Sequence, residues 1–121
     1  METKGKTVLY VDDEAVNLQL FDAHFNKYFK VLTSISPLDG INIIENQPVD
    51  ILITDFKMPG MNGIDFIKEV KKKHPGMKCL VISGYIDACV MLEGNQRLVH
   101  RYFLKPWTKE VILEELFSIL A

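Results

Sequence analysis

Residues 49–63 read VDILITDFKMPGMNG, an apolar run followed by an acid, a turn and the start of a helix. The run from Val49 to Ile53 is almost continuously apolar, which predicts a strand buried on both faces. Asn62-Gly63 is a helix start signal, and His74-Pro75-Gly76 is expected to end that helix. A buried strand followed directly by a helix is the repeating unit of a parallel α/β sheet.

The same unit recurs along the whole chain. Further strands are predicted at Thr7 to Val11, Phe29 to Thr33, Cys79 to Ile82 and Tyr102 to Leu104. Apolar residues at helical spacing lie between them or after the last one, in the sets Leu18, Phe21, Phe25, Tyr28 and Ile112, Leu116, Ile119. This order predicts the α/β class, with an open, doubly wound five-stranded parallel sheet covered by helices on both faces.

Local signals predict where two more helices begin. Ser36 before Pro37 is a predicted N-cap, because Pro suits the first helical position and a Ser oxygen can accept an orphan backbone N–H. Thr108 is the predicted N-cap of the last helix, with Trp107 packed onto Ile112 as a hydrophobic staple.

Composition limits what the chain can be. It has 121 residues, 48% hydrophobic, with 14 Lys plus Arg and 16 Asp plus Glu. We expect residues 1–121 to form one domain with a sizeable core. A net charge of −2 argues against direct nucleic-acid binding, because a binder needs a basic face for several phosphates. No apolar stretch approaches the length of a membrane span, so we expect a cytoplasmic protein that does not bind membranes. Cys79 and Cys89 show no metal-binding spacing, so both are expected to be reduced, buried thiols.

Polar residues follow four of the predicted strands where each one ends. They are Asp12-Asp13-Glu14, Asp55, Ser83-Gly84 and Lys105-Pro106. Parallel strands bring these ends to one edge of the sheet, which is where such folds bind ligands. One interpretation is that these residues only mark strand ends. The other is that three converging carboxylates either raise their pKa values or hold a hard cation, for which Mg²⁺ is the natural choice.

The second interpretation carries a specific chemistry. Asp13 and Asp55 can each offer one oxygen to Mg²⁺, a loop carbonyl just after Asp55 another, and waters the rest, one of them held by Asp12. A carboxylate can attack phosphorus when cations neutralise the developing charge, and Asp55 is the best candidate nucleophile. Lys105 and the Ser83 hydroxyl could then contact phosphoryl oxygens. The chain has neither of the glycine-rich phosphate motifs G-x-x-x-x-G-K-S/T and G-x-G-x-x-G, which argues against a nucleotide or flavin site.

Four motifs in order resemble one family. They are VDDE at 11–14, ITDFKMPGMNG at 53–63, VISGY at 81–85 and YFLKPW at 102–107. The chain resembles the receiver domain of bacterial two-component response regulators, similar to the single-domain chemotaxis type. The resemblance covers nearly the whole chain and implies a flavodoxin-like (βα)5 fold with strand order 2-1-3-4-5.

The resemblance also implies a phosphorelay function. Asp55 would accept a phosphoryl group from a phosphohistidine of a histidine kinase or histidine phosphotransfer protein. Mg²⁺ would be bound by Asp12, Asp13, Asp55 and the Lys57 backbone carbonyl. Such a protein promotes its own phosphorylation and dephosphorylation and is not an enzyme acting on an external substrate.

The remaining implied roles concern the response to phosphorylation. Lys105 would bind the phosphoryl group, and the Lys105-Pro106 peptide bond that follows it would be cis. Ser83 would be the switch hydroxyl, with the small Gly84 beside it. Tyr102 would be the switch aromatic. These changes would remodel the surface of the fourth helix, fifth strand and fifth helix. That surface would signal to an output domain or another protein, and it would also suit a homodimer.

Two further features have open interpretations. Lys57 and Tyr85 occupy positions that influence the phosphoryl lifetime in the family, and we expect Tyr85 to shield the acyl phosphate from water.

The segment Ile86 to Leu92 is more apolar than one buried helix stripe requires. It is either a deeply packed helix or an exposed patch for a partner or dimer, with Val90 and Met91 as candidate contacts.

Two other function classes remain as alternatives. An aspartate-nucleophile phosphohydrolase would want its nucleophile at the first strand in a D-x-D arrangement, whereas Asp12 and Asp13 are adjacent. A receiver-like interaction module without phosphorylation would typically lack an acid or the lysine, and none is lost here.

Overall fold

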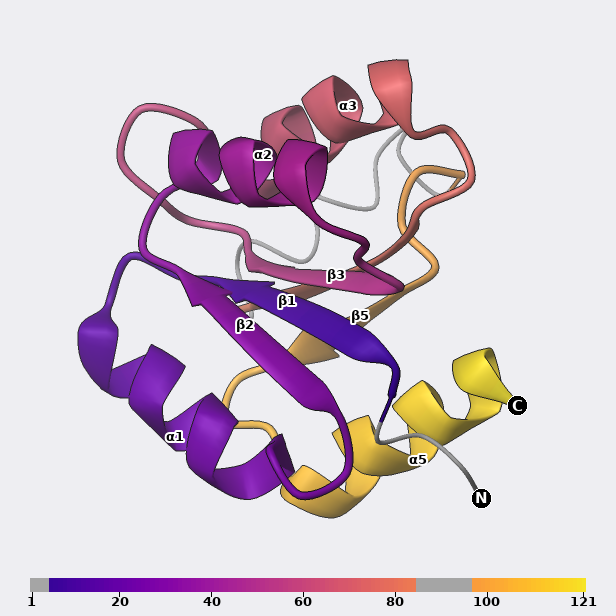
Figure 1. Cartoon of the computed structure of the whole chain (residues 1–121). Helices are drawn as coiled ribbons and strands as arrows, with labels where there is room; N and C mark the ends of the chain where they lie inside the picture. The colour runs from indigo at the N-terminus through magenta and orange to yellow at the C-terminus, as the bar shows by residue number, and fades with distance from the viewer. Residues whose placement is uncertain (1–4, 85–96) are drawn as a thin grey trace.

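The computed structural model describes residues 5–84 and 97–121, and its centre is a five-stranded parallel sheet (Figure 1). The strand order is β2-β1-β3-β4-β5, which confirms the predicted doubly wound topology. The strands are β1 (Thr7–Val11), β2 (Lys30–Ser34), β3 (Ile51–Asp55), β4 (Lys78–Ser83) and β5 (Arg101–Leu104).

Helices cover both faces of this sheet. The helices of the described ranges are α1 (Ala15–Phe25), α2 (Pro37–Asn46), α3 (Gly63–Lys73) and α5 (Lys109–Leu120). Figure 1 shows α1 and α5 on one face and α2 and α3 on the other. The predictions for Tyr85, Cys89 and the segment Ile86 to Leu92 lie outside the described residues.

The predicted helix starts are confirmed by side-chain caps. Ser36 Oγ accepts the Asp39 N–H at 3.2 Å, and Asn62 Oδ1 accepts the Asp65 N–H at 2.8 Å. Thr108 Oγ1 accepts the Val111 N–H at 3.4 Å. Each cap satisfies a backbone donor that has no partner inside its helix.

Every strand except β1 differs by one or two residues from its predicted bounds, and α1 ends earlier than predicted. β3 begins at Ile51 and not at Val49, because Asp50 turns out of the sheet: its carboxylate accepts the Thr7 N–H at 2.8 Å. The apolar period of α1 continues to Tyr28, but the helix ends at Phe25. Tyr28 lies in the following turn, and its ring packs at 6.0 Å from that of Phe117.

The alternating strand residues build two apolar cores. On β1, Val8 and Tyr10 face the core under α1 and α5, whereas Leu9 and Val11 face the core under α2 and α3. Cys79 in the second core is a free thiol, and burial raises its pKa to about 12, so it stays protonated at neutral pH.

Trp107 has a wider role than the predicted staple. It packs in the same apolar cluster as Ile112, and its ring also lies 6.3 Å from the Phe21 ring and 5.8 Å from the Phe25 ring. The segment before α5 is therefore fastened to α1.

Candidate functional site

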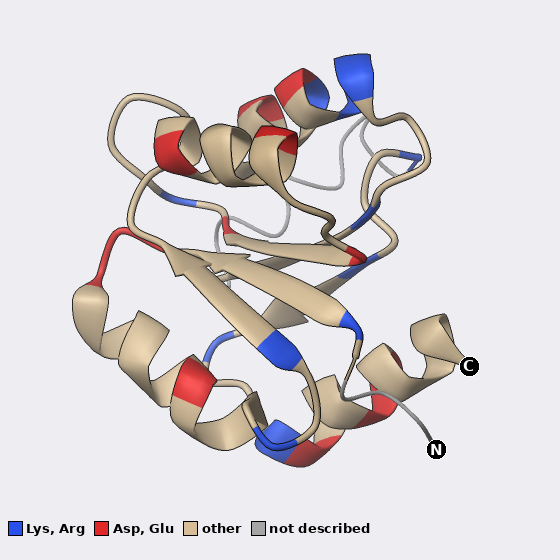
Figure 2. Ribbon diagram, viewed as in Figure 1, with Lys and Arg blue, Asp and Glu red and all other residues tan. Residues whose placement is uncertain are grey.

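Three carboxylates meet at the carboxyl end of the sheet. One ligand oxygen from each of Asp12, Asp13 and Asp55 lies within 4.8 Å of the others. Asp12 is fully buried and Asp55 is 5% exposed. The loop that joins β1 to α1 carries three successive acids and is drawn red in Figure 2. Oxygen donors at this spacing suit a hard divalent cation, so the residues present fit a metal ion.

Asp12 is held by donors that the sequence interpretation did not identify. The Tyr10 hydroxyl donates to Asp12 Oδ2 at 2.6 Å, and the Asn17 amide donates to the same oxygen at 3.1 Å. The Glu14 N–H donates to Oδ1 at 3.0 Å. Burial and the hydrogen bond to Asp12 raise the pKa of Tyr10, so its hydroxyl remains a donor.

A sequence signal for Tyr10 does exist. It is the one aromatic residue in an otherwise aliphatic stretch of β1, two positions before Asp12. Residues two apart in an extended chain point to the same side, so the phenol and the carboxylate can meet. Asn17 lies in the first turn of α1 and gives no comparable signal.

Asp55 is paired with Lys105. Lys105 Nζ lies 3.1 Å from Asp55 Oδ1. Burial raises the pKa of the Asp55 carboxyl, the charge of Asp12 adds to this, and the hydrogen bond from Lys105 offsets only part of it. Burial lowers the pKa of Lys105, but its hydrogen bond to Asp55 and the surrounding negative charges reverse the effect, so the net shift is upward. The lysine therefore stays charged beside the acids.

Ser83 is the last residue of β4, and its hydroxyl is fully buried. Its Oγ has no hydrogen-bond partner among the described residues. An orphaned buried hydroxyl is costly unless a ligand or a moving group satisfies it. The Ser83 carbonyl accepts the Lys105 N–H at 2.8 Å, so the strand ends that carry these two residues are joined directly.

A cavity of about 590 Å³ opens beside the acids. It is large enough for a phosphoryl group with its waters. Its lining residues come from four strand ends or the loops after them: Asp13, Glu14, Asp55, Lys57, Met58, Pro59, Gly84 and Lys105. The Lys105-Pro106 peptide bond at its rim is cis.

The loop after β3 approaches the strand end closely. A Cβ on Gly63 would lie 2.5 Å from the Asp55 carbonyl oxygen, and the Gly63 N–H donates to the Phe56 carbonyl at 2.7 Å. Gly60 has a φ of 83°, a left-handed conformation that favours glycine. These two glycines let residues 56–62 turn back over Asp55.

The other predicted site residues lie at different distances from this centre. Lys57 and Gly84 line the cavity. Tyr102 is half-buried on β5, is paired in register with Val81 and packs against the core under α2 and α3. Tyr85 lies outside the described residues.

Comparison with known proteins identifies the family. Residues 8–117 match the family model described as the response regulator receiver domain. The chain belongs to the response regulator receiver family. Receiver domains are phosphoryl-accepting signalling domains of two-component systems.

Individual relatives extend the comparison. The chain is 35% identical over 115 residues to the hydrogenase transcriptional regulatory protein HoxA of Cupriavidus necator, covering 94% of this chain and 24% of that protein. It is 31% identical over 81 residues to a chemotaxis protein CheY homolog of Campylobacter jejuni, covering 65% and 62% of the two chains. The chain thus spans about a quarter of the length of HoxA.

Solved structures share the fold. A receiver domain protein from Clostridium thermocellum is 28% identical with a TM-score of 0.89, covering 96% of this chain and 94% of that one. Among the residues that the structure describes, no helix is both long and apolar enough to span a membrane.

Proposed function

We propose that this receiver accepts a phosphoryl group on Asp55 from a phosphohistidine and does so with Mg²⁺. The observation that carries the proposal is the position of Asp55, whose carboxylate lies within 4.8 Å of Asp12 and Asp13 and 3.1 Å from Lys105. Lys105 can offset negative charge that develops during the transfer, and the neighbouring acids offer oxygens to a cation that would offset more of it.

The metal would be held by side chains already grouped at the sheet edge. Asp12, Asp13, Asp55 and the Lys57 backbone carbonyl are the proposed ligands, directly or through water. Bound Mg²⁺ would supply neutralisation of phosphoryl and carboxylate charge. The family supports this assignment, and the geometry of the three acids fits it.

The protein's own residues would carry the transfer. An oxygen of Asp55 attacks phosphorus, the new O–P bond forms, and the P–N bond to the histidine breaks. Lys105 neutralises a phosphoryl oxygen from one side. Ser83 donates its unpartnered hydroxyl to another, which would satisfy a buried group that otherwise has no partner in the described structure.

Phosphorylation would then change the surface of the domain. We propose that movement of Ser83, given room by Gly84, is accompanied by reorientation of Tyr102 on β5. The affected surface includes β5, α5 and the segment that precedes β5. It would bind an output domain, another protein or a second copy of the chain. HoxA is a transcriptional regulator, and by analogy a transcriptional output is one candidate.

Two residues are proposed to set the lifetime of the phosphoryl group. Lys57 lines the cavity beside Asp55, and Tyr85 follows Gly84 in the chain. Timing the dephosphorylation of Tyr85→Ala tests the second role, because loss of a shielding ring should shorten the half-life. An unchanged half-life would remove Tyr85 from the proposal.

The central test is phosphorylation by a small phosphodonor such as acetyl phosphate, followed by intact mass. We expect one phosphoryl adduct that requires Mg²⁺ and is absent in Asp55→Asn. The matched control is Asp50→Asn, which changes an acid at the opposite end of the same strand and should keep the adduct. No adduct on the wild type would contradict the proposal. Rapid turnover of an external phosphoester without an adduct would indicate a phosphohydrolase.

A further inference from the structure

Tyr10 is a buried tyrosine whose hydroxyl reaches the acid cluster from the core. It is 1% exposed, and its 2.6 Å hydrogen bond to Asp12 joins two buried side chains that are two positions apart in the chain. We propose that Tyr10 is a positioning residue that, together with Asn17, fixes which carboxylate oxygen of Asp12 faces the metal. This inference rests on the proposed function and adds to it a residue that determines Mg²⁺ affinity.

The hydrogen bonds of Asp12 distinguish its two oxygens. A carboxylate oxygen has two lone-pair sites for acceptance. Oδ2 accepts both Tyr10 and Asn17, at 2.6 and 3.1 Å, so its capacity is filled. Oδ1 accepts only the Glu14 N–H, at 3.0 Å, among the described groups. Oδ1 is therefore the oxygen left to hold a metal ion or a metal-bound water.

The Tyr10 ring is itself fixed in place. It stacks on Phe21 with ring centroids 4.5 Å apart and an interplanar angle of 27°. Phe21 in turn contacts Phe25 at 4.5 Å and Trp107 at 6.3 Å. A ring held by such a stack cannot swing its hydroxyl away, so the donor direction toward Asp12 is set by the core and not by the exposed loop.

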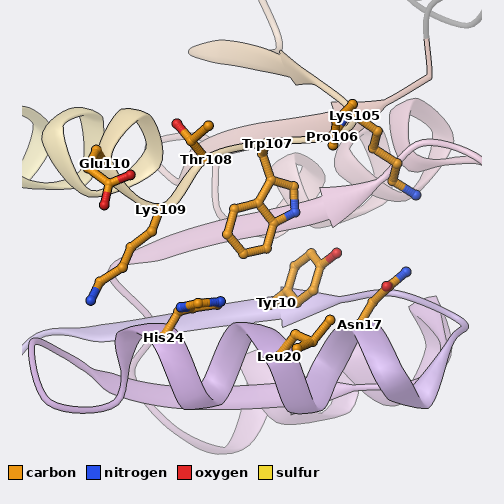
Figure 3. Close-up of a pocket in the computed structure, with 10 residues that line it drawn as sticks. All are labelled: Tyr10, Asn17, Leu20, His24, Lys105, Pro106, Trp107, Thr108, Lys109 and Glu110. Atoms are coloured by element: carbon orange, nitrogen blue, oxygen red, sulfur yellow. The ribbon is translucent and has the colours of Figure 1, made fainter.

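Both donors bond the same Asp12 oxygen and line one cavity. Tyr10 and Asn17 line a cavity of about 740 Å³ between α1 and the segment that contains Trp107. Figure 3 shows the Tyr10 hydroxyl directed toward the Asn17 and Lys105 end of this cavity. The two donors, one from β1 and one from α1, thus hold the same oxygen of Asp12 together.

Hydrogen bonds from neighbouring residues to a metal-binding side chain orient that side chain, and their removal typically weakens metal affinity by about 10- to 100-fold. The test is calorimetric titration of Mg²⁺ into the protein without phosphodonor. Tyr10→Phe keeps the stacked ring and removes only the hydroxyl, so we expect a dissociation constant about tenfold higher than that of the wild type. Asn17→Ala removes the second donor and should also raise the Mg²⁺ dissociation constant.

Tyr28→Phe is the matched control, since it also removes one phenolic hydroxyl from a tyrosine packed on a phenylalanine. Its ring contacts are with residues after α1 and on α5, and we expect an unchanged Mg²⁺ dissociation constant. A Tyr10→Phe constant equal to or lower than that of the wild type would overturn the inference.

A second measurement separates positioning from a general structural role. In phosphorylation by acetyl phosphate, the Mg²⁺ concentration at half-maximal rate should rise about tenfold in Tyr10→Phe, while the rate at saturating Mg²⁺ stays at the wild-type value. A fall in the saturated rate without a change in half-saturation would contradict the inference. Absence of Mg²⁺ binding or of an Asp55 adduct in the wild type would instead contradict the proposed function itself.

Discussion

The two ends of β3 each carry an aspartate, and the two acids have opposite environments. Asp50 precedes the strand, is exposed, and accepts the Thr7 N–H at 2.8 Å. Asp55 ends the strand, is 5% exposed, and lies with Asp12 and Asp13. The first carboxylate satisfies a backbone donor and supports the fold. The second is crowded by like charges, and burial with the Asp12 charge raises its pKa.

The same contrast extends across the sheet. At the amino-terminal edge, Asp50 and Thr7 exchange hydrogen bonds, and Gly76 in the turn before β4 has open space around it. At the carboxyl edge, Ser83 has an unpartnered hydroxyl within the described structure and Gly63 is pressed against backbone. Local arrangements that cost stability gather at one edge, as is usual where function and not folding selects the residues.

The largest expected effect is that of a methyl group added at the crowded edge. Gly63→Ala would place Cβ 2.5 Å from the Asp55 carbonyl oxygen and 3.0 Å from Phe56 Cα, and both are backbone atoms that cannot move cheaply. We expect the free energy of unfolding to fall by about 2–3 kcal/mol, the upper range for overpacking. Urea denaturation of the variant and the wild type measures this loss of unfolding free energy.

The control lies at the opposite edge. Gly76→Ala meets nothing within 4 Å and should change the free energy of unfolding by less than about 0.5 kcal/mol. Equal losses for the two variants would mean that the crowding at Gly63 relaxes easily and that the edges do not differ in this respect.

Neutralising the aspartate just before β3 and the aspartate at its end should change the free energy of unfolding in opposite directions. Without Mg²⁺ at pH 7, Asp55→Asn should raise the free energy of unfolding by on the order of 1 kcal/mol, because removing a buried charge from beside Asp12 and Asp13 gains more than the loss of its ion pair with Lys105 costs. Asp50→Asn exchanges a charged acceptor for a neutral one and should lower it by about 0.5 kcal/mol. Thermal and urea unfolding with a chelator check both values.

The pH dependence tests the cause of the Asp55 effect. The folded-state pKa of Asp55 is raised above 3.8, so the unfolded chain releases this proton first as pH rises. The wild type thus keeps this contribution to stability below pH 3.8 and loses it as pH rises through the folded-state pKa. The advantage of Asp55→Asn should therefore grow from acid to neutral pH. Saturating Mg²⁺ should reverse it, because the metal stabilises only the wild-type site. An advantage independent of pH would exclude charge as its cause.

Two buried hydroxyls on neighbouring strands give a smaller comparison. Thr54 Oγ1 donates to the Asp55 carbonyl at 2.9 Å, whereas Ser83 Oγ has no partner in the described structure. We expect Thr54→Val to lower the free energy of unfolding by about 1 kcal/mol and Ser83→Ala to leave it unchanged or slightly higher. A loss of about 1 kcal/mol in Ser83→Ala would show that its hydroxyl is satisfied by water in solution.

The core and the order of strands and helices were predictable from the sequence because every local signal agreed there. Apolar runs, the caps at Ser36, Asn62 and Thr108, and the acids after the first and third strands all favour one topology. Such patterns can be interpreted from the sequence alone where the local preference agrees with the global fold. The family resemblance then supplied the strand order, which no single run could give.

Other features depend on contacts that no local pattern contains. The strand boundary at Asp50 is set by its hydrogen bond to Thr7, 43 positions away. The end of α1 before Tyr28 and the contact of Trp107 with α1 depend on where α5 packs. The hydrogen bond from Asn17 to Asp12 follows from the direction in which α1 leaves β1.

The smallest effect is expected for an exposed ion pair far from the acid cluster. Lys72 Nζ lies 2.8 Å from Glu69 Oε1 at the end of α3, with side chains 69% and 44% exposed. Glu69→Gln should lower the free energy of unfolding by less than about 0.5 kcal/mol, because solvent screens such pairs. In about 1 M NaCl the screening length falls to roughly 3 Å, so the difference should disappear. The pair of Lys105 with the buried Asp55 lies where solvent screens less, so the effect of Asp55→Asn should persist in the same salt. If salt abolished both differences equally, the carboxyl edge would be as well hydrated as the surface of α3. The two ends of β3 would then differ in their residues but not in the solvent exposure of their charges.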